Sequence, residues 1–209
     1  LTSKNESEIP SFNLEKRFEL PSVKEWCEPL NKIVNVDYYV PGCPPQPKNL
    51  ELLLNLLKEY VSTGNLPPKG TVLAGEKTLC DECPREKPEK IVIERIYRPH
   101  EVKIDPKKCL LAQEILCLGP VTRSGCEAKC ISANMPCWGC MGPPENVKDV
   151  AAKFISTIGS LIQADKEREV GEEELLKIIN TIHDPLGTFY RFTLPSSTFG
   201  RVLRRKKHE

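Results

Sequence analysis

The sequence predicts an α+β protein in which much of the chain is irregular. Three observations support this class. Apolar patterns typical of strands and helices occur near both ends of the chain but fade in the middle. The 19 prolines favour turns and loops over a regular bundle, and an aromatic content of 6% predicts a modest core for 209 residues. We therefore expect three parts, at residues 1–66, 67–145 and 146–209.

The N-terminal part is predicted to be half of an α/β unit. Residues 32–40 are β-branched and aromatic, which indicates a buried strand, and a proline-rich turn at 41–45 ends it. A helix is predicted over 47–61, with Gly64 as its stop. Its apolar stripe consists of Leu50, Leu53, Leu54 and Leu57. Because a lone strand and helix cannot cover both faces of a sheet, we expect a preceding segment or a partner to supply the missing strands.

The central part shows little periodicity, with one short strand candidate at 91–97. Eight of the ten cysteines lie between residues 80 and 140. A region this long and irregular needs something other than apolar packing to hold its shape. We expect it to have too little apolar interior of its own and to be stabilised by metal.

The C-terminal part returns to helical spacing. An apolar face over 145–162 predicts a helix, and 172–182 predicts a shorter one. The tail from His183 is predicted to be a loop with aromatic anchors, and the basic run at 201–207 to be a solvated end or a docking patch.

The cysteines form two groups of four, and each group contains one pair separated by two residues. That spacing lets both sulfurs face one metal centre while the intervening amides turn toward the sulfurs. Nearby glycines allow the backbone to approach a cluster closely. The groups are Cys80-x2-Cys83 with Cys109-x7-Cys117, and Cys126-x3-Cys130-x6-Cys137-x2-Cys140.

Three kinds of chemistry are compatible with these groups. Disulfides are disfavoured because nothing in the sequence indicates secretion. A zinc ribbon usually presents two such close pairs per site, whereas each group here has only one. Iron–sulfur ligation fits better, because two adjacent groups of four in one small region make a natural electron relay. Zinc remains the alternative.

Other functional classes lack support in the sequence. A net charge of +1 gives no indication of nucleic-acid binding. The apolar runs are too short to span a bilayer, and the opening segment has no secretory core. No catalytic triad, phosphate-binding loop or dinucleotide fingerprint occurs, so we expect no catalytic residue on this chain. His100 and His183 are expected to be ordinary loop histidines.

An ordered set of motifs carries a family resemblance over residues 32–160. The motifs are Pro41-Gly42-Cys43-Pro44-Pro45, Cys80-Asp81-Glu82-Cys83-Pro84-Arg85, the segment 109–120, Thr122-Arg123-Ser124-Gly125-Cys126 and Pro136-Cys137-Trp138-Gly139-Cys140. Together they resemble the small subunits of NiFe hydrogenases, in particular the cytosolic sulfhydrogenase and viologen-reducing types.

The resemblance implies ligands for up to three 4Fe–4S clusters. A distal cluster would use Cys80, Cys83, Cys109 and Cys117, and a medial cluster Cys126, Cys130, Cys137 and Cys140. Cys130 as fourth ligand implies four irons rather than three. Cys43 would be the last ligand of a proximal cluster. The other proximal ligands of the family precede this position in a flavodoxin-like domain, so that cluster is expected only if they are supplied.

The same resemblance implies the organisation of the chain. Residues 1–66 would be the C-terminal remnant of the flavodoxin-like domain, 67–145 an iron–sulfur domain, and 146–209 C-terminal helices. Cys27 does not match the family and is expected to be a packed free thiol. Asp81, Glu82 and Arg85 are expected to be solvated, with contact to a redox partner as the alternative. Trp138 is expected to shield a cluster from water.

The implied function is electron transfer in a cytoplasmic hydrogenase. The chain would relay electrons between the NiFe site of a large subunit and a soluble acceptor or donor, through a further redox subunit or diaphorase-type partner. We expect no nucleic-acid partner and no membrane span. Two alternatives remain: a cluster-carrying subunit of a complex I-like oxidoreductase, and a zinc-stabilised interaction module.

Overall fold

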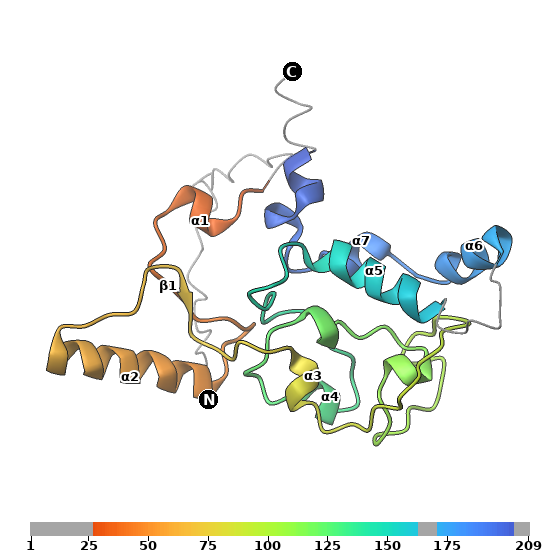
Figure 1. Ribbon diagram of the computed structural model, residues 1–209, viewed down its shortest axis with the longest axis horizontal. Coiled ribbons are helices and arrows are strands. Elements are labelled where there is room, and N and C mark those ends of the chain that lie inside the picture. Colours follow the sequence, from red (N-terminus) through yellow and green to blue (C-terminus); the bar gives the residue numbers. More distant parts are fainter. Residues whose placement is uncertain (1–26, 163–170, 203–209) are drawn as a thin grey trace, which may run out of the picture.

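The computed structural model describes residues 27–162 and 171–202. It is a mixed α/β chain in which most elements are short (Figure 1). The strands are β1 (Tyr38–Tyr39) and β2 (Thr71–Val72). The helices are α1 (Leu30–Ile33), α2 (Pro47–Thr63), α3 (Leu79–Glu82), α4 (Lys129–Ser132), α5 (Val150–Ile162), α6 (Glu172–Asn180) and α7 (Pro185–Phe189), with 3-10 turns η1 (Leu111–Gln113), η2 (Gly119–Val121) and η3 (Leu194–Ser196).

The N-terminal unit is a strand–helix–strand arrangement with a very small sheet. β1 and β2 pair in parallel, with Tyr38 opposite Thr71, and α2 connects them. Pro47 begins α2, where its missing N–H is not needed. Gly64 ends the helix at φ 70°, and its N–H bonds the Tyr60 carbonyl at 2.8 Å. The predicted helix and its stop are confirmed.

Two strand predictions were wrong. Residues 32–40 form a strand only at Tyr38–Tyr39, and Leu30–Ile33 are helical. Residues 91–97 contain no strand, only a single bridge from Tyr97 to Ile115. Apolar β-branched residues extend a strand only where a neighbouring strand can pair with it, and the described sheet has two strands of two residues each.

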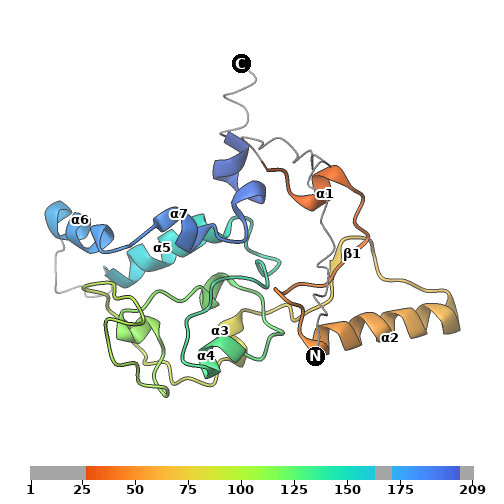
Figure 2. The same cartoon turned by 180° about the vertical axis from the view of Figure 1, so that it is seen from behind.

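The core lies between α5 and the cysteine-bearing loops. Phe154 on α5 and Val121 in η2 are fully buried, and the Phe154 ring packs edge-to-face on Phe189 of α7 at 5.6 Å. Figures 1 and 2 show α5 and α7 together on one side of these loops, with α2 at the far end of the molecule.

The irregular central part supplies much of that core, which corrects the expectation that it lacks an apolar interior. Its sharp turns bring short apolar segments together from many directions, so burial here does not require long helices or strands. The buried apolar side chains from this part include Leu79, Ile93, Ile96, Leu110, Leu111, Ile115, Leu116, Leu118, Val121 and Ile131.

The C-terminal helices agree with the sequence in position but differ in length. α5 begins at Val150 rather than at 145, and α6 ends at Asn180. The predicted loop after His183 contains the short helix α7, which Asp184 caps by accepting a hydrogen bond from the Gly187 N–H at 2.9 Å. The part of the basic run that follows Val202 lies outside the described residues. Residues 1–26 also lie outside them.

No helix among the described residues is both long and apolar enough to cross a bilayer. The division at residues 66 and 145 stays a prediction, and so does the flavodoxin-like character of the first part.

Candidate metal centre

The first close pair of cysteines is presented by α3. Thr78 and Asp81 form a capping box: the Asp81 carboxylate accepts from the Thr78 N–H at 3.0 Å and from its hydroxyl at 2.7 Å. The Thr78 hydroxyl bond is the largest cause of the lowered pKa of Asp81. Cys80 therefore lies in a fixed helical turn and Cys83 at the C-cap of that turn. Asp81, expected to be merely solvated, holds this turn in place.

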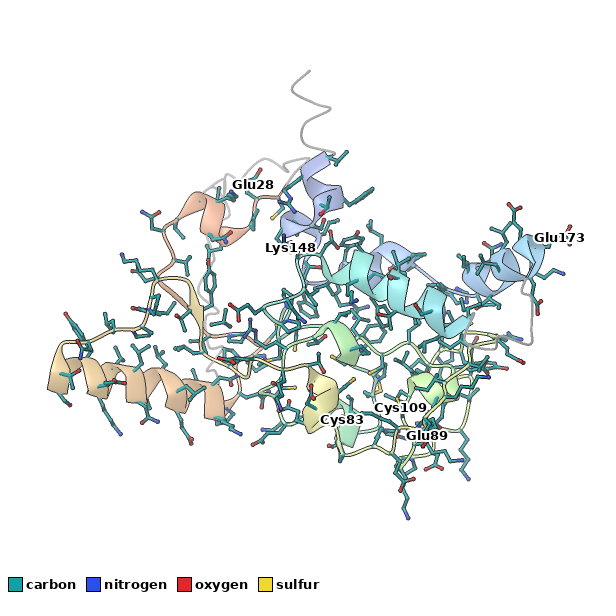
Figure 3. All side chains as sticks on the ribbon, in the orientation of Figure 1. Glu28, Cys83, Glu89, Cys109, Lys148 and Glu173 are labelled. Carbon is teal, nitrogen blue, oxygen red and sulfur yellow. The ribbon has the colours of Figure 1, made fainter. Side chains whose placement is uncertain are left out.

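The other two cysteines of this group come from distant segments. A Cβ atom placed on Gly119 would lie 3.1 Å from the Cys80 sulfur and 3.7 Å from the Cys117 sulfur, so both sulfurs border the same small space. The Cys109 N–H bonds the Glu86 carbonyl at 2.8 Å, which joins the Cys109 segment to the chain just after Cys83. Figure 3 shows Cys83 and Cys109 in the same loop region. The structure thus places these cysteines in one region, where the charges of Cys80, Cys83 and Cys109 are close enough to interact.

The second group surrounds the turn that contains Trp138. Cys126 lies close enough to Cys137 and Cys140 for their charges to interact, and Cys140 interacts in the same way with Cys130. The Gly139 N–H points at the Cys137 sulfur, 3.4 Å away. Gly139 adopts φ +88°, a left-handed conformation that side chains disfavour. Glycine here allows the backbone to turn an amide toward the sulfur.

The two groups meet at Cys117 and Cys137. Both side chains are buried, and the Cys137 N–H donates to the Cys117 sulfur at 3.3 Å. One cysteine of the second group is thereby hydrogen-bonded to a cysteine of the first. This contact places the two groups next to each other.

Burial controls the acidity of these thiols. It raises the pKa of Cys80 to about 12, with a further increase from the neighbouring Cys109. It also raises the pKa of Cys137 to about 12 and that of Cys117 to about 11. The pKa values of Cys126 and Cys140 are raised as well, again chiefly by burial. In the metal-free chain these thiols are protonated at neutral pH, and ligation must displace their protons.

Arg85 braces the two groups against each other, which the sequence analysis missed. Its side chain is only 4% exposed. The guanidinium donates to the carbonyls of Asp105 and Lys108 at 2.8 and 2.9 Å, beside Cys109. It also donates to the Ile131 carbonyl at 3.1 Å and the Asn134 amide oxygen at 2.6 Å, beside Cys130. The expectation of a solvated Arg85 was wrong.

Glu82 makes a second link between the groups. It lies between Cys80 and Cys83, yet its carboxylate accepts from the N–H groups of Gly125 and Cys126 at 3.0 and 3.1 Å. The carboxylate therefore fixes the loop that carries the first cysteine of the second group. The expectation that Glu82 is merely solvated was also wrong. Its position between two cysteines was visible in the sequence, but its contact with amides 43 residues away was not.

The two remaining cysteines differ in their surroundings. Cys43 is exposed but lies beside the second group, where its N–H hydrogen-bonds the Cys140 thiol and opposes the effect of burial on the pKa of that thiol. Cys27 is exposed, not packed as expected, because it leads into α1, in which no residue is buried. All ten cysteines are free thiols. Among the described residues, no three His, Cys, Asp or Glu side chains are arranged around a single-ion site.

Trp138 lies between Cys137 and Cys140 in the second close pair, and its role in shielding a cluster stays a prediction. Its ring is partly buried, and the Arg191 guanidinium stacks over it at 4.4 Å from the ring centre. Exposed His100 and His183 line the shallow polar pocket next to it. Both histidines are loop residues, as expected.

Comparison with curated proteins identifies relatives among archaeal hydrogenase components. The G subunit of the F420-non-reducing hydrogenase of Methanothermus fervidus is 42% identical over 120 residues, which cover 56% of this chain and 91% of that protein. The chain belongs to this family of hydrogenase subunits. The corresponding protein of Methanothermobacter thermautotrophicus is 37% identical over 208 residues, covering 98% of this chain and 61% of the relative. No protein-family model matches the chain.

These relatives are components of a hydrogenase, which is an oxidoreductase. The relative from Archaeoglobus profundus is named as an iron-sulfur subunit of that hydrogenase; it is 36% identical over 195 residues, covering 90% of this chain and 57% of the relative. The name agrees with the gathering of cysteines in the present structure. The chain spans about three-fifths of the length of the longer relatives it matches.

Proposed function

We propose that this chain is the electron-transfer subunit of a NiFe hydrogenase and carries two 4Fe–4S clusters. Cys80, Cys83, Cys109 and Cys117 would hold the distal cluster, and Cys126, Cys130, Cys137 and Cys140 the medial one. When bound, each cluster supplies reversible one-electron redox chemistry. The partners would be a large subunit with the NiFe site and a further redox subunit, in the cytoplasm.

The observation that carries this proposal is the junction between the quartets. The hydrogen bond from the Cys137 N–H to the Cys117 sulfur, at 3.3 Å, joins two buried cysteines, one from each proposed quartet. A relay needs redox centres that are close together, and this contact supports two clusters at neighbouring positions. Amide donors at the sulfurs stabilise the negative charge of a thiolate-bound cluster.

The chain's own residues suit iron–sulfur ligation. Gly119 leaves room beside the sulfurs of Cys80 and Cys117 that any side chain would fill. Arg85 and Glu82 connect the loops that carry the two groups of cysteines. Cys43 lies beside the medial quartet through its bond to Cys140. This position supports a third, proximal cluster next to the medial one, provided that the remaining ligands are supplied.

Replacing Cys130 tests the ligand assignment. We expect Cys130→Ala to leave the distal cluster intact and to convert the medial cluster into a three-iron cluster, visible by EPR in anaerobically purified protein. Cys43→Ala is the matched control, since Cys43 is also exposed and next to Cys140, and it should leave both clusters unchanged. A spectrum altered by Cys43→Ala but not by Cys130→Ala would reverse the assignment.

Co-purification tests the assembly. The proposal expects the full-length subunit to be isolated with a nickel-containing large subunit. Isolation of the iron-loaded subunit with a nickel-free oxidoreductase instead would support the complex I-like alternative. A colourless, zinc-containing protein would support the interaction module.

A further inference from the structure

Thr122 is a buried polar residue that contacts both the chain backbone and a cysteine of the medial quartet. It ends η2 and is 1% exposed. Its hydroxyl donates to the Leu118 carbonyl at 2.6 Å, and its oxygen lies 3.5 Å from the Cys137 sulfur, where it accepts from the protonated thiol. Thr122 is thus positioned to interact with whichever form of Cys137 is present.

Ligation of iron reverses the direction of the contact with Cys137. The thiol loses its proton, so the sulfur can only accept a hydrogen bond. The Thr122 hydroxyl then has two possible acceptors, the Leu118 carbonyl and the Cys137 sulfur. A hydrogen bond to a charged acceptor is roughly twice as strong as one to a neutral acceptor, which favours the sulfur as its negative charge grows.

The Leu118 carbonyl keeps a hydrogen-bond donor if the Thr122 hydroxyl turns away from it. The Val121 N–H also donates to Leu118, at 3.1 Å. Rotation of the Thr122 hydroxyl toward the sulfur therefore leaves no buried carbonyl unsatisfied, and the usual cost of such a loss is avoided. The Gly139 N–H, at 3.4 Å, is the other donor that points at the Cys137 sulfur.

We propose that Thr122 is a potential-tuning residue whose hydroxyl donates to the Cys137 sulfur and stabilises the reduced state of the medial cluster. This inference rests on the proposed function, because it requires a cluster on Cys137. Reduction adds negative charge, so a donor at the sulfur stabilises the reduced state more than the oxidised state and raises the reduction potential. Thr122 is a positioning residue: it acts through a ligand and binds no metal itself.

The test is a redox titration of the anaerobically loaded full chain, followed by EPR. Thr122→Val keeps the shape of the side chain and removes the donor. We expect the equilibrium constant for reduction of the medial cluster to fall about tenfold, or about 59 mV for a one-electron couple. The distal midpoint should not move. The EPR signal of the medial cluster is identified with the Cys130→Ala variant, in which it should become the signal of a three-iron cluster.

Two further variants separate tuning from a structural role. Thr122→Ser keeps the hydroxyl and should retain the wild-type midpoint. Thr188→Val is the matched control, because Thr188 is also buried but its hydroxyl donates to the His183 carbonyl at 3.2 Å, away from the cysteines. It should leave both midpoints unchanged.

The results distinguish this inference from the proposed function. Wild-type protein that binds no iron would refute the function. An iron-loaded Thr122→Val variant with an unchanged medial midpoint would overturn only the role of Thr122, and would show that its hydroxyl stays on Leu118. If the valine variant loads no iron, the same measurement compares Thr122→Ala with Thr122→Ser. Equal medial midpoint potentials in that pair would overturn the tuning role of Thr122.

Discussion

The helix α2 and the loops that carry the cysteines show opposite relations between regularity and burial. α2 is the longest described helix, yet most of its apolar side chains are exposed, including Leu54 at 55% and Val61 at 85%. The cysteine loops have only short helical turns, yet Leu79, Leu118 and Val121 are almost completely buried. Regular structure depends on local propensity and capping, whereas burial depends on which segments the fold brings together.

The contrast has a functional meaning. The loops bury apolar side chains around the sulfurs and brace the ligand segments with Arg85 and Glu82. The described core includes Cys117 and Cys137 and leaves α2 outside. Substitutions in the two regions should accordingly have very different effects.

The largest expected difference is between Phe154 and Leu54. Phe154→Ala removes a fully buried ring from the core and should lower the free energy of unfolding by about 3–5 kcal/mol. Leu54→Ala on α2 should change it by no more than about 0.5 kcal/mol, because that side chain is 55% exposed. Urea denaturation of the anaerobic protein measures both. Equal losses of unfolding free energy in the two variants would mean that α2 packs against the core in solution, which would contradict the contrast between the two regions.

Removal of the Arg85 guanidinium should have the next largest effect. Arg85→Met removes the hydrogen bonds from the buried guanidinium to the Lys108 and Ile131 carbonyls and to the Asn134 side chain, and should cost roughly 2–3 kcal/mol. Iron content should fall as well, because the segments beside Cys109 and Cys130 lose their common brace. Arg98→Met is the control, since Arg98 is exposed, and it should alter neither property. Full iron content in Arg85→Met would show that the brace is dispensable.

Glu82→Gln is expected to have a smaller effect. The amide that replaces the carboxylate still accepts a hydrogen bond but loses the charge that strengthens the bonds to the Gly125 and Cys126 amides. We expect a loss of about 1 kcal/mol in the free energy of unfolding. The matched control is Glu89→Gln, because Glu89 is exposed and lies on an outer loop (Figure 3). Identical denaturation midpoints for the two variants would show that the Glu82 carboxylate does not stabilise the fold.

Much of the local structure could be predicted from the sequence. Pro47 and Gly64 mark the ends of α2, and the apolar spacing after residue 145 predicts α5, because capping and periodicity are local signals. Three residues of the apolar stripe predicted for α2, Leu50, Leu54 and Leu57, are exposed. Periodicity identifies such a face without showing whether a neighbour is present to bury it.

The sequence pointed to the cysteines of the candidate site but not to the residues that support them. The spacing of close cysteine pairs is a local signal, and the assignment of these cysteines as cluster ligands stays a prediction. Arg85, Glu82 and Thr122 act across 46, 43 and 15 residues of sequence respectively. Such contacts depend on how the loops are arranged in space, so they cannot be predicted from a local sequence pattern.

Chemical analysis of the anaerobically purified chain tests the central claim most directly. Two 4Fe–4S clusters require about eight iron atoms and about eight acid-labile sulfides per chain. We expect both values, with broad visible absorbance that is lost on acidification. Protein of the same fold that contains stoichiometric zinc and no labile sulfide would contradict the claim that these cysteines hold iron–sulfur clusters.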